Sequence, residues 1–519
     1  MALDEVVEGD DGIAVCQQPL RHHASDVAGG AGDEDGHDRS GAGTESLLFP
    51  RPGTGGNMRR RPQPCLHVLG ALLLAGGCGG APAANPPADA EAVTAVVYSG
   101  ARLIPGDGAA PVDGGVLVVD TGVIIDAGPA DAVTAPEGAH VVDLSGRTVI
   151  PALVNLHGHV GFQRGLTYDG ANYTRENIED HLQRYAYHGV GVIVSMGTDA
   201  GDLWREIQSD QAAGRTSGAR LFTAGRGLAA PMAGPGAAAL RPSAAGVTSE
   251  DEGRALVREL AGQGVSFIKI WVDDRGGTVE KLAPAYYRAI IDEAHQQGVD
   301  VIAHVFYHDD AEDLVAAGVD GFAHLVRDRE MDDALIDAIV ENDVFVMPNL
   351  GISERGRHAA PPPWVGEPLL AETVGAAVLA RMDDSFSRRE PAAAERAAQS
   401  YALMERSLAK LQAAGASLVL GSDSGVQDHV FGFSAHRELE LMVAAGLSPM
   451  DAIVTATSRS ADRLGLSDTG RLTSGARADF LVLDGNPLDD ITSTRRIDAV
   501  YLAGTAVDRE SLSAAWTSR

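Results

Sequence analysis

The chain has 519 residues, enough to bury a large core and to hold two or three domains. Its 41 lysines and arginines against 72 aspartates and glutamates give a formal net charge of −31, which argues against nucleic acid as a partner. Its three cysteines, Cys16, Cys65 and Cys78, all lie near the N-terminus, so neither a disulfide framework nor a cysteine zinc site is expected in the rest of the chain.

The N-terminal part is expected to direct export of the protein. Residues 1–57 are rich in glycine, aspartate and histidine and lack apolar periodicity, which predicts disorder, and translation is expected to start naturally at Met58. Residues 58–78 combine three arginines, a short apolar stretch and small residues before Cys78. This is the pattern of a signal peptide with a lipobox-like end, and an ordinary cleaved signal or a chance apolar stretch is the alternative.

Residues 79–92 form a proline- and alanine-rich linker, which suits a tether from a membrane. We therefore expect an exported protein, either a cell-envelope lipoprotein or a periplasmic protein. Its contact with a membrane would be through the N-terminal lipid anchor alone.

Short β-like runs separated by turns fill both flanks of the remaining chain. Residues 93–147 contain runs at 95–98, 115–119, 123–126 and 140–143, and residues 465–510 contain runs at 478–483 and 497–502. Neither flank has enough strands for a good sheet alone. We therefore expect the two flanks to build one small β-sandwich together.

The central residues 148–464 alternate strand-like and helix-like runs, which is typical of a parallel α/β fold. Eight strand-like runs occur in order, at 149–156, 191–196, 220–224, 266–271, 299–305, 321–325, 344–348 and 417–421. A mostly helical stretch, 369–414, separates the last two, and residues 284–297 are predicted as an amphipathic helix ending at Gly298. The expected fold class is α/β, with a (β/α)8 TIM-like barrel.

Four histidines lie at or just beyond the ends of three of these runs. His157 and His159 follow the first run, His304 the fifth and His324 the sixth. His157 and His159 are two apart on an extended chain, so both side chains leave the same face. A hydrogen-bonded core histidine explains any one of them, but four at strand ends are hard to explain as packing. Because neutral imidazole suits a divalent ion such as Zn²⁺, we predict a metal site.

Lys269 lies within the fourth run, where a buried ammonium is costly unless it is paired. A neutral lysine amine can add carbon dioxide to give a carbamate, which has the charge and shape of a carboxylate and can bridge two metal ions. Burial lowers the pKa of a lysine, which favours this reaction. The alternative is a salt bridge at the barrel mouth with Asp273 or Asp274.

Asp423 follows the last run within Gly-Ser-Asp-Ser-Gly. A carboxylate at this place can both ligate a metal ion and hold a proton. It would accept a proton from the metal-activated water and pass it to a leaving amine. The alternative is a Ser-Asp-Ser turn or helix cap.

Substrate contacts are expected in the loops that follow the strands. The residues placed to reach such a mouth are Arg226, Tyr307, His308 and Arg327. An arginine could hold a substrate carboxylate with two hydrogen bonds. The more common use of such residues is solvation or structural pairing.

These motifs resemble those of the amidohydrolase superfamily, in particular imidazolonepropionase-like enzymes and carbamylated-lysine prolidase-type peptidases. The resemblance covers roughly residues 93–502 and includes Leu-His-Gly-His at 156–159, Ile-Lys-Ile at 268–270, Ala-His-Val at 303–305, Ala-His-Leu at 323–325, Gly-Ser-Asp-Ser-Gly at 421–425 and Gly-Ala-Arg-Ala-Asp-Phe at 475–480. After Ile270 this chain carries Trp-Val-Asp-Asp-Arg-Gly-Gly, which is more acidic than the family form.

The resemblance implies two divalent metal ions and a division of ligands between them. The more buried ion would be held by His157, His159, carbamylated Lys269 and Asp423, and the second by Lys269, His304 and His324. A hydroxide that bridges the two ions would attack an amide or lactam carbonyl polarised by the second ion.

We therefore predict a metal-dependent amidohydrolase, with zinc as the expected ion, that cleaves a C–N bond of a small substrate. The substrate would be a dipeptide, an acylated amino acid or a cyclic amide, and a homo-oligomer is compatible with the sequence. The alternatives within the superfamily are a cyclic amidase or deaminase and a lactone or phosphoester hydrolase. An alternative of another class is a non-catalytic binding lipoprotein, against which the complete ligand set argues.

Overall fold

The computed structural model describes residues 95–426 and 429–518. The predictions for residues 1–92, which are disorder, a signal peptide with a lipobox-like end and a linker, lie outside these residues. Within the two described ranges, no helix has the length and apolar character needed to cross a membrane.

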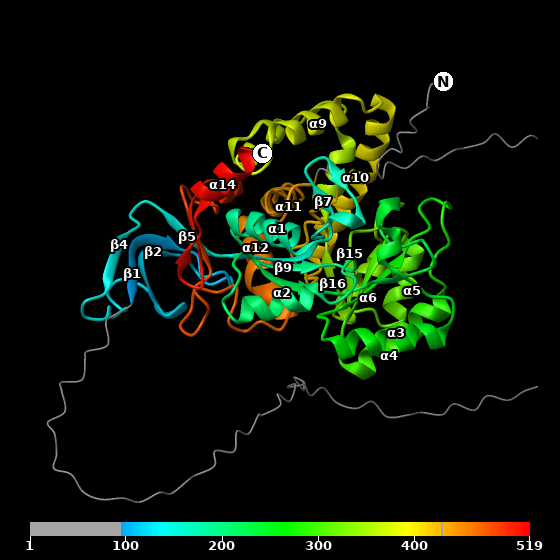
Figure 1. The fold of residues 1–519 in the computed structure, drawn as a ribbon, viewed down its shortest axis with the longest axis horizontal. Helices are drawn as coiled ribbons and strands as arrows, with labels where there is room; N and C mark the ends of the chain where they lie inside the picture. The colour runs from blue at the N-terminus through cyan, green and yellow to red at the C-terminus, as the bar shows by residue number, and fades with distance from the viewer. Residues whose placement is uncertain (1–94, 427–428, 519) are drawn as a thin grey trace, which may run out of the picture. The chain divides into compact units, whose positions relative to one another are not determined.

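One mixed sheet joins the two ends of the described chain, drawn as blue strands beside red ones in Figure 1. Its order is β19 (Thr505–Ala506), β18 (Ile497–Leu502), β17 (Phe480–Leu483), β5 (Thr148–Pro151), β1 (Val96–Leu103), β2 (Val112–Asp120) and β3 (Val123–Gly128), with β4 (His140–Asp143) paired to β1. The rings of Phe480 and Tyr501 stack with their centroids 4.7 Å apart, and Tyr98 meets both edge-on. Strands from both flanks thus share one sheet, and a two-layered β-sandwich stays a prediction.

The first predicted strand, 149–156, is wrong as a single unit, because it divides between two sheets. β5 pairs antiparallel with β17, whereas β6 (Leu153–Gly158) begins a separate parallel sheet. The backbone N–H of Ala152 still donates to Asp479 O, and that of Leu153 donates to Gly189 O. Pro151 has no N–H to donate, so the ladder with β17 weakens where the chain changes partners.

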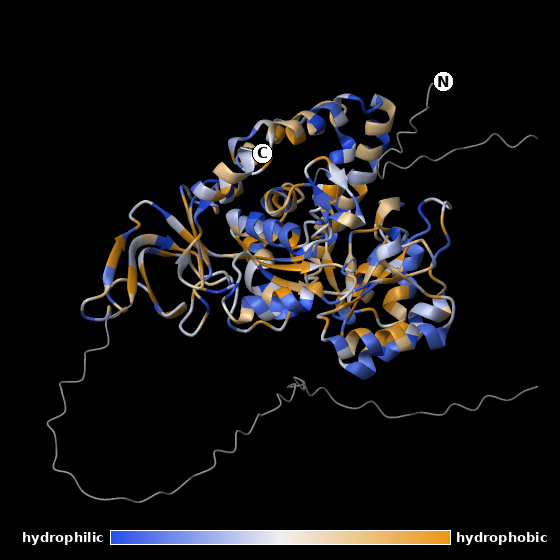
Figure 2. Ribbon diagram, viewed as in Figure 1, coloured by the Kyte–Doolittle hydropathy of each residue, from blue (hydrophilic) through white to orange (hydrophobic). Residues whose placement is uncertain are grey.

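Two parallel sheets make up the central part of the chain. One has the order β10 (Arg220–Thr223), β9 (Val190–Ser195), β6, and the other has the order β12 (Ala245–Gly246), β11 (Leu228–Ala229), β13 (Ile268–Val272), β14 (Val301–Val305), β15 (Gly321–Ala323), β16 (Phe345–Met347). Strands β9, β13 and β14 are buried along their whole length, as expected for parallel strands that are covered on both faces. Figure 2 shows these central strands as mainly hydrophobic.

The predicted eighth strand at 417–421 is not a strand, and the described residues form no closed barrel. Residues 417–424 still lie between β16 and β6, with isolated parallel bridges from Val346 to Leu418 and from Gly158 to Ser424. Regular pairing fails because side chains take two of the backbone N–H groups. Leu420 N donates to the Ser460 hydroxyl, and Ser422 N is shared between Asn155 Oδ1 and the backbone oxygen of His157.

Helices follow most of the parallel strands. They are α1 (Arg175–Tyr187), α2 (Leu203–Ala212), α3 (Glu250–Gln263), α4 (Pro284–Gln297), α5 (His308–Ala316), α6 (Asp333–Glu341), α7 (Leu350–Glu354), α11 (Phe433–Ala444), α12 (Pro449–Val454) and α13 (Ser460–Arg463). Helix α4 has the predicted bounds and ends at Gly298, whose φ of 72° suits a residue without a side chain. The predicted helical stretch contains α8 (Pro368–Ala371), α9 (Ala376–Ser387) and α10 (Pro391–Ala413), and α14 (Arg509–Thr517) ends the chain.

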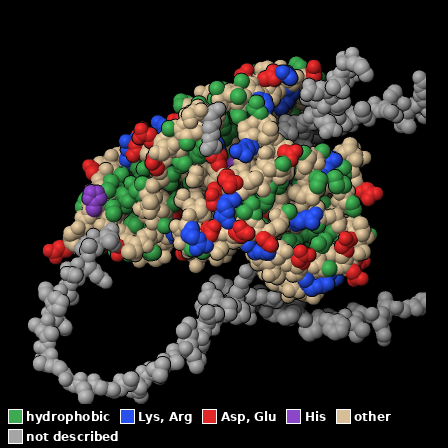
Figure 3. All heavy atoms as spheres, in the orientation of Figure 1, with side chains coloured by type: hydrophobic (Ala, Val, Ile, Leu, Met, Phe, Trp, Pro, Cys, Tyr) green, Lys and Arg blue, Asp and Glu red, His purple; other side chains and the backbone are tan. Residues whose placement is uncertain are grey.

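Charged side chains of both signs are interspersed on the face drawn in Figure 3. Many of them are paired; Arg175, for example, contacts Glu206 at 3.0 Å and Asp210 at 2.7 Å. Such a mixed surface offers no strongly basic patch on this face.

Candidate metal centre

All six predicted metal ligands are buried; five lie near or just beyond the C-terminal end of their strand or segment, whereas Lys269 is the second residue of β13. They come from β6 and the residue after it, from β13 and β14, from the residue after β15, and from segment 417–424; the side chains are His157, His159, Lys269, His304, His324 and Asp423. In a parallel fold these strand ends face one edge, where catalytic groups are placed. Their function as ligands stays a prediction.

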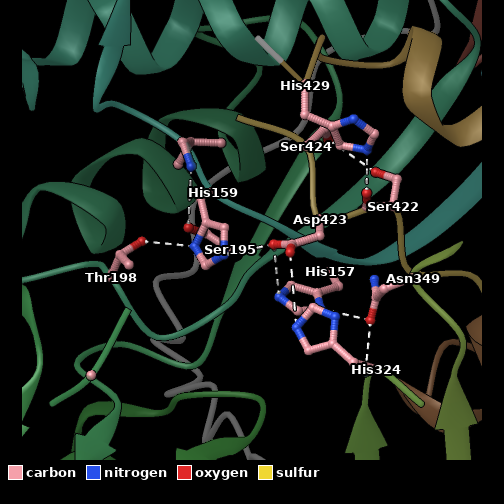
Figure 4. Close-up of polar contacts among 12 residues, drawn as sticks. His157, His159, Ser195, Thr198, His324, Asn349, Ser422, Asp423, Ser424 and His429 are labelled. Atoms are coloured by element: carbon pink, nitrogen blue, oxygen red, sulfur yellow. Dashed lines mark hydrogen bonds and ion pairs between the residues drawn. The ribbon is translucent and has the colours of Figure 1, made fainter. Parts of the chain in front are cut away.

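Asp423 lies at the centre of three imidazole rings, as Figure 4 shows. Its Oδ1 is 3.1 Å from His159 Nε2 and 3.3 Å from His157 Nε2, and its Oδ2 is 3.8 Å from His324 Nε2. One ligand atom from each of His157, His324 and Asp423 lies within 4.8 Å of the others. Three such atoms can surround a single divalent ion.

Three residues of this site have a left-handed backbone conformation. His324, Asn349 and Asp423 are not glycines, and their φ angles are 74°, 48° and 53°. Residues held in this left-handed region cost about 1–3 kcal/mol each, and they persist where the surrounding structure demands them. The strain therefore indicates that the direction of these three side chains matters.

The amine of Lys269 is buried and makes no hydrogen bond within the described residues. Two glycines make room for its stem, since a Cβ on Gly197 would approach Lys269 Cγ to 2.7 Å and one on Gly227 would approach it to 3.1 Å. Burial lowers the pKa of Lys269 to about 7; nearby Asp423 opposes this shift and Arg275 adds to it. At neutral pH much of this amine is therefore uncharged and nucleophilic.

The alternative salt bridge of Lys269 with Asp273 or Asp274 is not formed. Asp273 Oδ2 pairs with Arg275 Nη1 at 2.9 Å, and Asp274 Oδ1 accepts a 2.8 Å hydrogen bond from Tyr307 OH. Both carboxylates are thus engaged with other groups.

Three imidazoles of the site, those of His157, His304 and His324, are in the neutral form that binds metal ions. Burial lowers the pKa of His157 to about 3 and holds the pKa values of His304 and His324 well below the ordinary value, so these rings are neutral. Burial alone would raise the pKa of Asp423, but His157 and the hydrogen bond from His159 outweigh it and hold that pKa well below its usual range.

This donor set fits a divalent cation. Imidazole rings surround an ionised carboxylate. Two buried nitrogens, Lys269 Nζ and His324 Nδ1, have no hydrogen-bond partner in the described chain. Buried polar atoms without partners are rare in folded proteins and call for an explanation, such as an ion. A bound cation would be a partner for the lone pairs of the histidines. It would also be a partner for Lys269 in its carbamate form.

Residues that sequence reasoning missed orient the rings from behind. Asn349 Oδ1 accepts hydrogen bonds from His157 Nδ1 at 3.2 Å and from the backbone N–H of His324 at 3.0 Å. Thr198 Oγ1 lies 3.2 Å from His159 Nδ1. Asn349 could have been found from the sequence, because it lies just after the seventh predicted strand, as several of the predicted ligands lie just after theirs.

His304 stands apart from the group around Asp423. Its ring centroid is 4.6 Å from that of His324, but its Nε2 faces Asp273 Oδ2 at 3.1 Å. The structure thus places His304 beside the site and engages one of its two ring nitrogens elsewhere.

The four predicted substrate contacts all have structural partners. Arg226 donates to Ser243 O and Ala244 O at 3.0 and 2.9 Å, and Arg327 donates to Val305 O at 3.4 Å. The ring nitrogens of His308 lie 3.0 Å from Arg329 Nη2 and 3.4 Å from the backbone N of Asp332, and Tyr307 OH donates to Asp274. A role of these residues in binding substrate stays a prediction.

Comparisons with known proteins match most of the described chain. The amidohydrolase family profile matches residues 148–507. The chain is 25% identical over 426 residues to imidazolonepropionase of Deinococcus radiodurans, which covers 76% of this chain and 92% of that protein. It resembles the structure of a candidate prolidase from Bifidobacterium longum with a TM-score of 0.65 and 26% identity, over 81% of this chain and 98% of the other.

A further likeness concerns the fold alone. The structure of a Xaa-Pro dipeptidase with methionine bound in its active site matches with a TM-score of 0.63 and 23% identity, over 79% of this chain and 99% of the other. Together these likenesses identify the fold of the central part as TIM-barrel-like, although its described strands form no closed barrel.

Proposed function

This chain belongs to the amidohydrolase family, and from that premise we propose that it is a metal-dependent hydrolase of a carbon–nitrogen bond in a small substrate. The proposal depends mainly on the arrangement of buried groups: the ionised Asp423 lies among imidazole rings, and the buried amine of Lys269 makes no hydrogen bond within the described residues. A non-catalytic binding protein would have no need of such a costly arrangement.

We propose that His157, His159, Lys269 and Asp423 hold one zinc ion and that Lys269, His304 and His324 hold a second. For Lys269 to serve both, its neutral amine adds carbon dioxide: a bond forms between nitrogen and carbon, one proton leaves, and a carbamate results. The low pKa of Lys269 supports this step, because the uncharged amine is the reacting form. When bound, such ions polarise a carbonyl and lower the pKa of water to about 7.

Asp423 is proposed to move the proton. The pKa of Asp423 lies well below its usual range, so its carboxylate is in the ionised form that can accept a proton from the attacking water. It would then donate that proton to the leaving nitrogen as the carbon–nitrogen bond breaks. Burial of the cluster keeps bulk water from competing for the same proton.

The substrate is proposed to be a dipeptide or an acylated amino acid. The likeness to a candidate prolidase over 81% of the chain supports this class. The second candidate is a cyclic amide, which the similarity to imidazolonepropionase over 76% of the chain favours. We further propose that the protein is exported with an N-terminal lipid anchor at Cys78 and that the shared terminal sheet is part of a small β-sandwich.

The experiment that tests the function measures both metal and turnover. The full chain loaded with Zn²⁺ and bicarbonate would be assayed against dipeptides, N-acyl amino acids and cyclic amides. We expect bound zinc and hydrolysis of one of these classes, with Lys269→Ala losing both. Lys281→Ala is the matched control, since Lys281 pairs with Asp310 at 2.7 Å and is not among the predicted ligands. A wild-type protein that binds no divalent ion and hydrolyses none of these substrates would contradict the proposal.

A further inference from the structure

The loop after β13 contains Asp273, whose carboxylate contacts the predicted metal ligand His304. Asp273 is only 3% exposed, and its Oδ2 lies 3.1 Å from Nε2 of His304. We propose that Asp273, held by Arg275, is a positioning residue that fixes His304 in the form that offers Nδ1 to the second metal ion. This inference rests on the proposed function and adds to it a residue outside the ligand set.

Arg275 holds the carboxylate of Asp273 from two directions. Its Nη1 lies 2.9 Å from Asp273 Oδ2, and its backbone N–H donates to Asp273 Oδ1 at 2.9 Å. A second guanidinium nitrogen donates to Gly234 O at 3.1 Å, so the arginine is itself anchored. The φ of Arg275 is 52°, in the left-handed region. Both oxygens of Asp273 are therefore engaged, and the carboxylate points at His304.

The proton of the neutral His304 ring is placed by this contact. An ionised carboxylate only accepts hydrogen bonds, so the ring nitrogen that faces it must carry the hydrogen. The hydrogen is then on Nε2, and the lone pair is on Nδ1. Nδ1 makes no hydrogen bond within the described chain, and the His304 ring lies 4.6 Å from the His324 ring. Metal-binding histidines commonly donate their other N–H to such a carboxylate.

His157 shows the opposite arrangement on the other side of the site. There Nδ1 donates to Asn349 Oδ1 at 3.2 Å, and Nε2 faces Asp423 at 3.3 Å. The two rings are thus held so that they offer different nitrogens. The difference arises because Asp273 accepts a hydrogen bond from Nε2 of His304, whereas Asn349 accepts one from Nδ1 of His157.

The test titrates the metal-free full chain with Co²⁺ in the presence of bicarbonate and follows visible absorption and stoichiometry. Wild type is expected to bind two ions. Asp273→Ala is expected to bind the second ion about 10- to 100-fold more weakly, with a changed absorption spectrum, while the first ion binds as in wild type. Asp274→Ala is the matched control, because it removes the neighbouring carboxylate, which contacts Tyr307, and should leave both affinities unchanged.

Two further variants separate positioning from folding and from direct ligation. Arg275→Gln keeps Asp273 but removes the guanidinium, and we expect a smaller loss of affinity for the second ion. If Asp273 acts through His304, adding Asp273→Ala to His304→Asn should cause no further loss. A further loss in this double variant would show that Asp273 itself binds the ion and would overturn the inference. Unchanged Co²⁺ binding by a folded Asp273→Ala would overturn it while the proposed function stands, and a wild type that binds no Co²⁺ would overturn both.

Discussion

The side-chain oxygen of Asn349 lies 3.2 Å from Nδ1 of His157, and it also accepts the backbone N–H of His324 at 3.0 Å. One amide oxygen thus joins two predicted metal ligands from different strands. Asn349 itself has a left-handed φ of 48°, which asparagine tolerates better than most residues. The relative placement of the two histidines depends on this residue.

Replacing Asn349 should therefore weaken metal binding. Asn349→Gly keeps the left-handed backbone but removes the acceptor, and we expect zinc affinity to fall by about 10- to 100-fold. Zinc affinity would be measured by competition with a chelator. Asn349→Ala should bind zinc at least as weakly and also be less stable than Asn349→Gly, by about 1–2 kcal/mol for the backbone conformation. Wild-type affinity in a folded Asn349→Gly would contradict this role.

The reactivity of Lys269 should depend on pH in a defined direction. Because its pKa is about 7, the amine is protonated and unreactive below this pH and neutral above it. With isotopically labelled bicarbonate, the carbamate signal of the metal-free protein should rise as pH increases through about 7. Lys269→Ala should lack this signal. A carbamate signal that first appears near the ordinary pKa of lysine would contradict the lowered pKa.

The glycines beside Lys269 should be intolerant of side chains. A Cβ on Gly227 would collide with the ring of Trp271 and approach Lys269 Cγ to 3.1 Å. We expect Gly227→Ala to displace the lysine stem and to reduce bound zinc, measured by elemental analysis of the purified protein. Gly262→Ala is the control, since Gly262 lies in α3 with nothing within 4 Å of an added Cβ. This control should bind zinc normally and gain about 0.5–1 kcal/mol of stability. Normal zinc content in Gly227→Ala would contradict the steric argument.

Glu438 should make the stability of the protein depend on pH. Its buried carboxylate accepts from the backbone N–H groups of Leu350 and Gly351, each at 2.7 Å, and burial raises its pKa to about 8. Between about pH 4.5 and about pH 8, the folded state therefore keeps a proton on Glu438 that the unfolded state has lost. The free energy of unfolding should therefore fall as pH rises from about 4.5 to about 8.

Glu438→Gln tests this dependence, because the amide does not titrate. Denaturant unfolding at several pH values should give a shallower slope for the variant than for wild type in the same window. Glu259, which is exposed on α3, provides the matched control, and Glu259→Gln should keep the wild-type slope. Equal slopes in wild type and Glu438→Gln would show that Glu438 is not the group responsible.

Much of the site could be predicted because its residues follow short apolar runs. The runs before His304 and His324 became β14 and β15, and the parallel arrangement brought both residues to one edge. Helix α4 was also predictable, because Pro284 and Gly298 mark its two ends locally. The division between β5 and β6 could not be predicted, because it depends on pairing with strands elsewhere in the sequence. β5 pairs with β17, and β6 pairs with β9.

The sequence by itself determined which chemical groups the candidate site contains: imidazoles, one lysine amine and one carboxylate, each in or just after a short apolar run. Only the tertiary structure decided which nitrogen of each ring is free. Asp273 takes Nε2 of His304 and Asn349 takes Nδ1 of His157, through contacts between residues 31 and 192 positions apart. Hydrophobic periodicity determines where a strand ends and which face is buried, whereas a hydrogen bond of about 3 Å depends on the packing of distant elements.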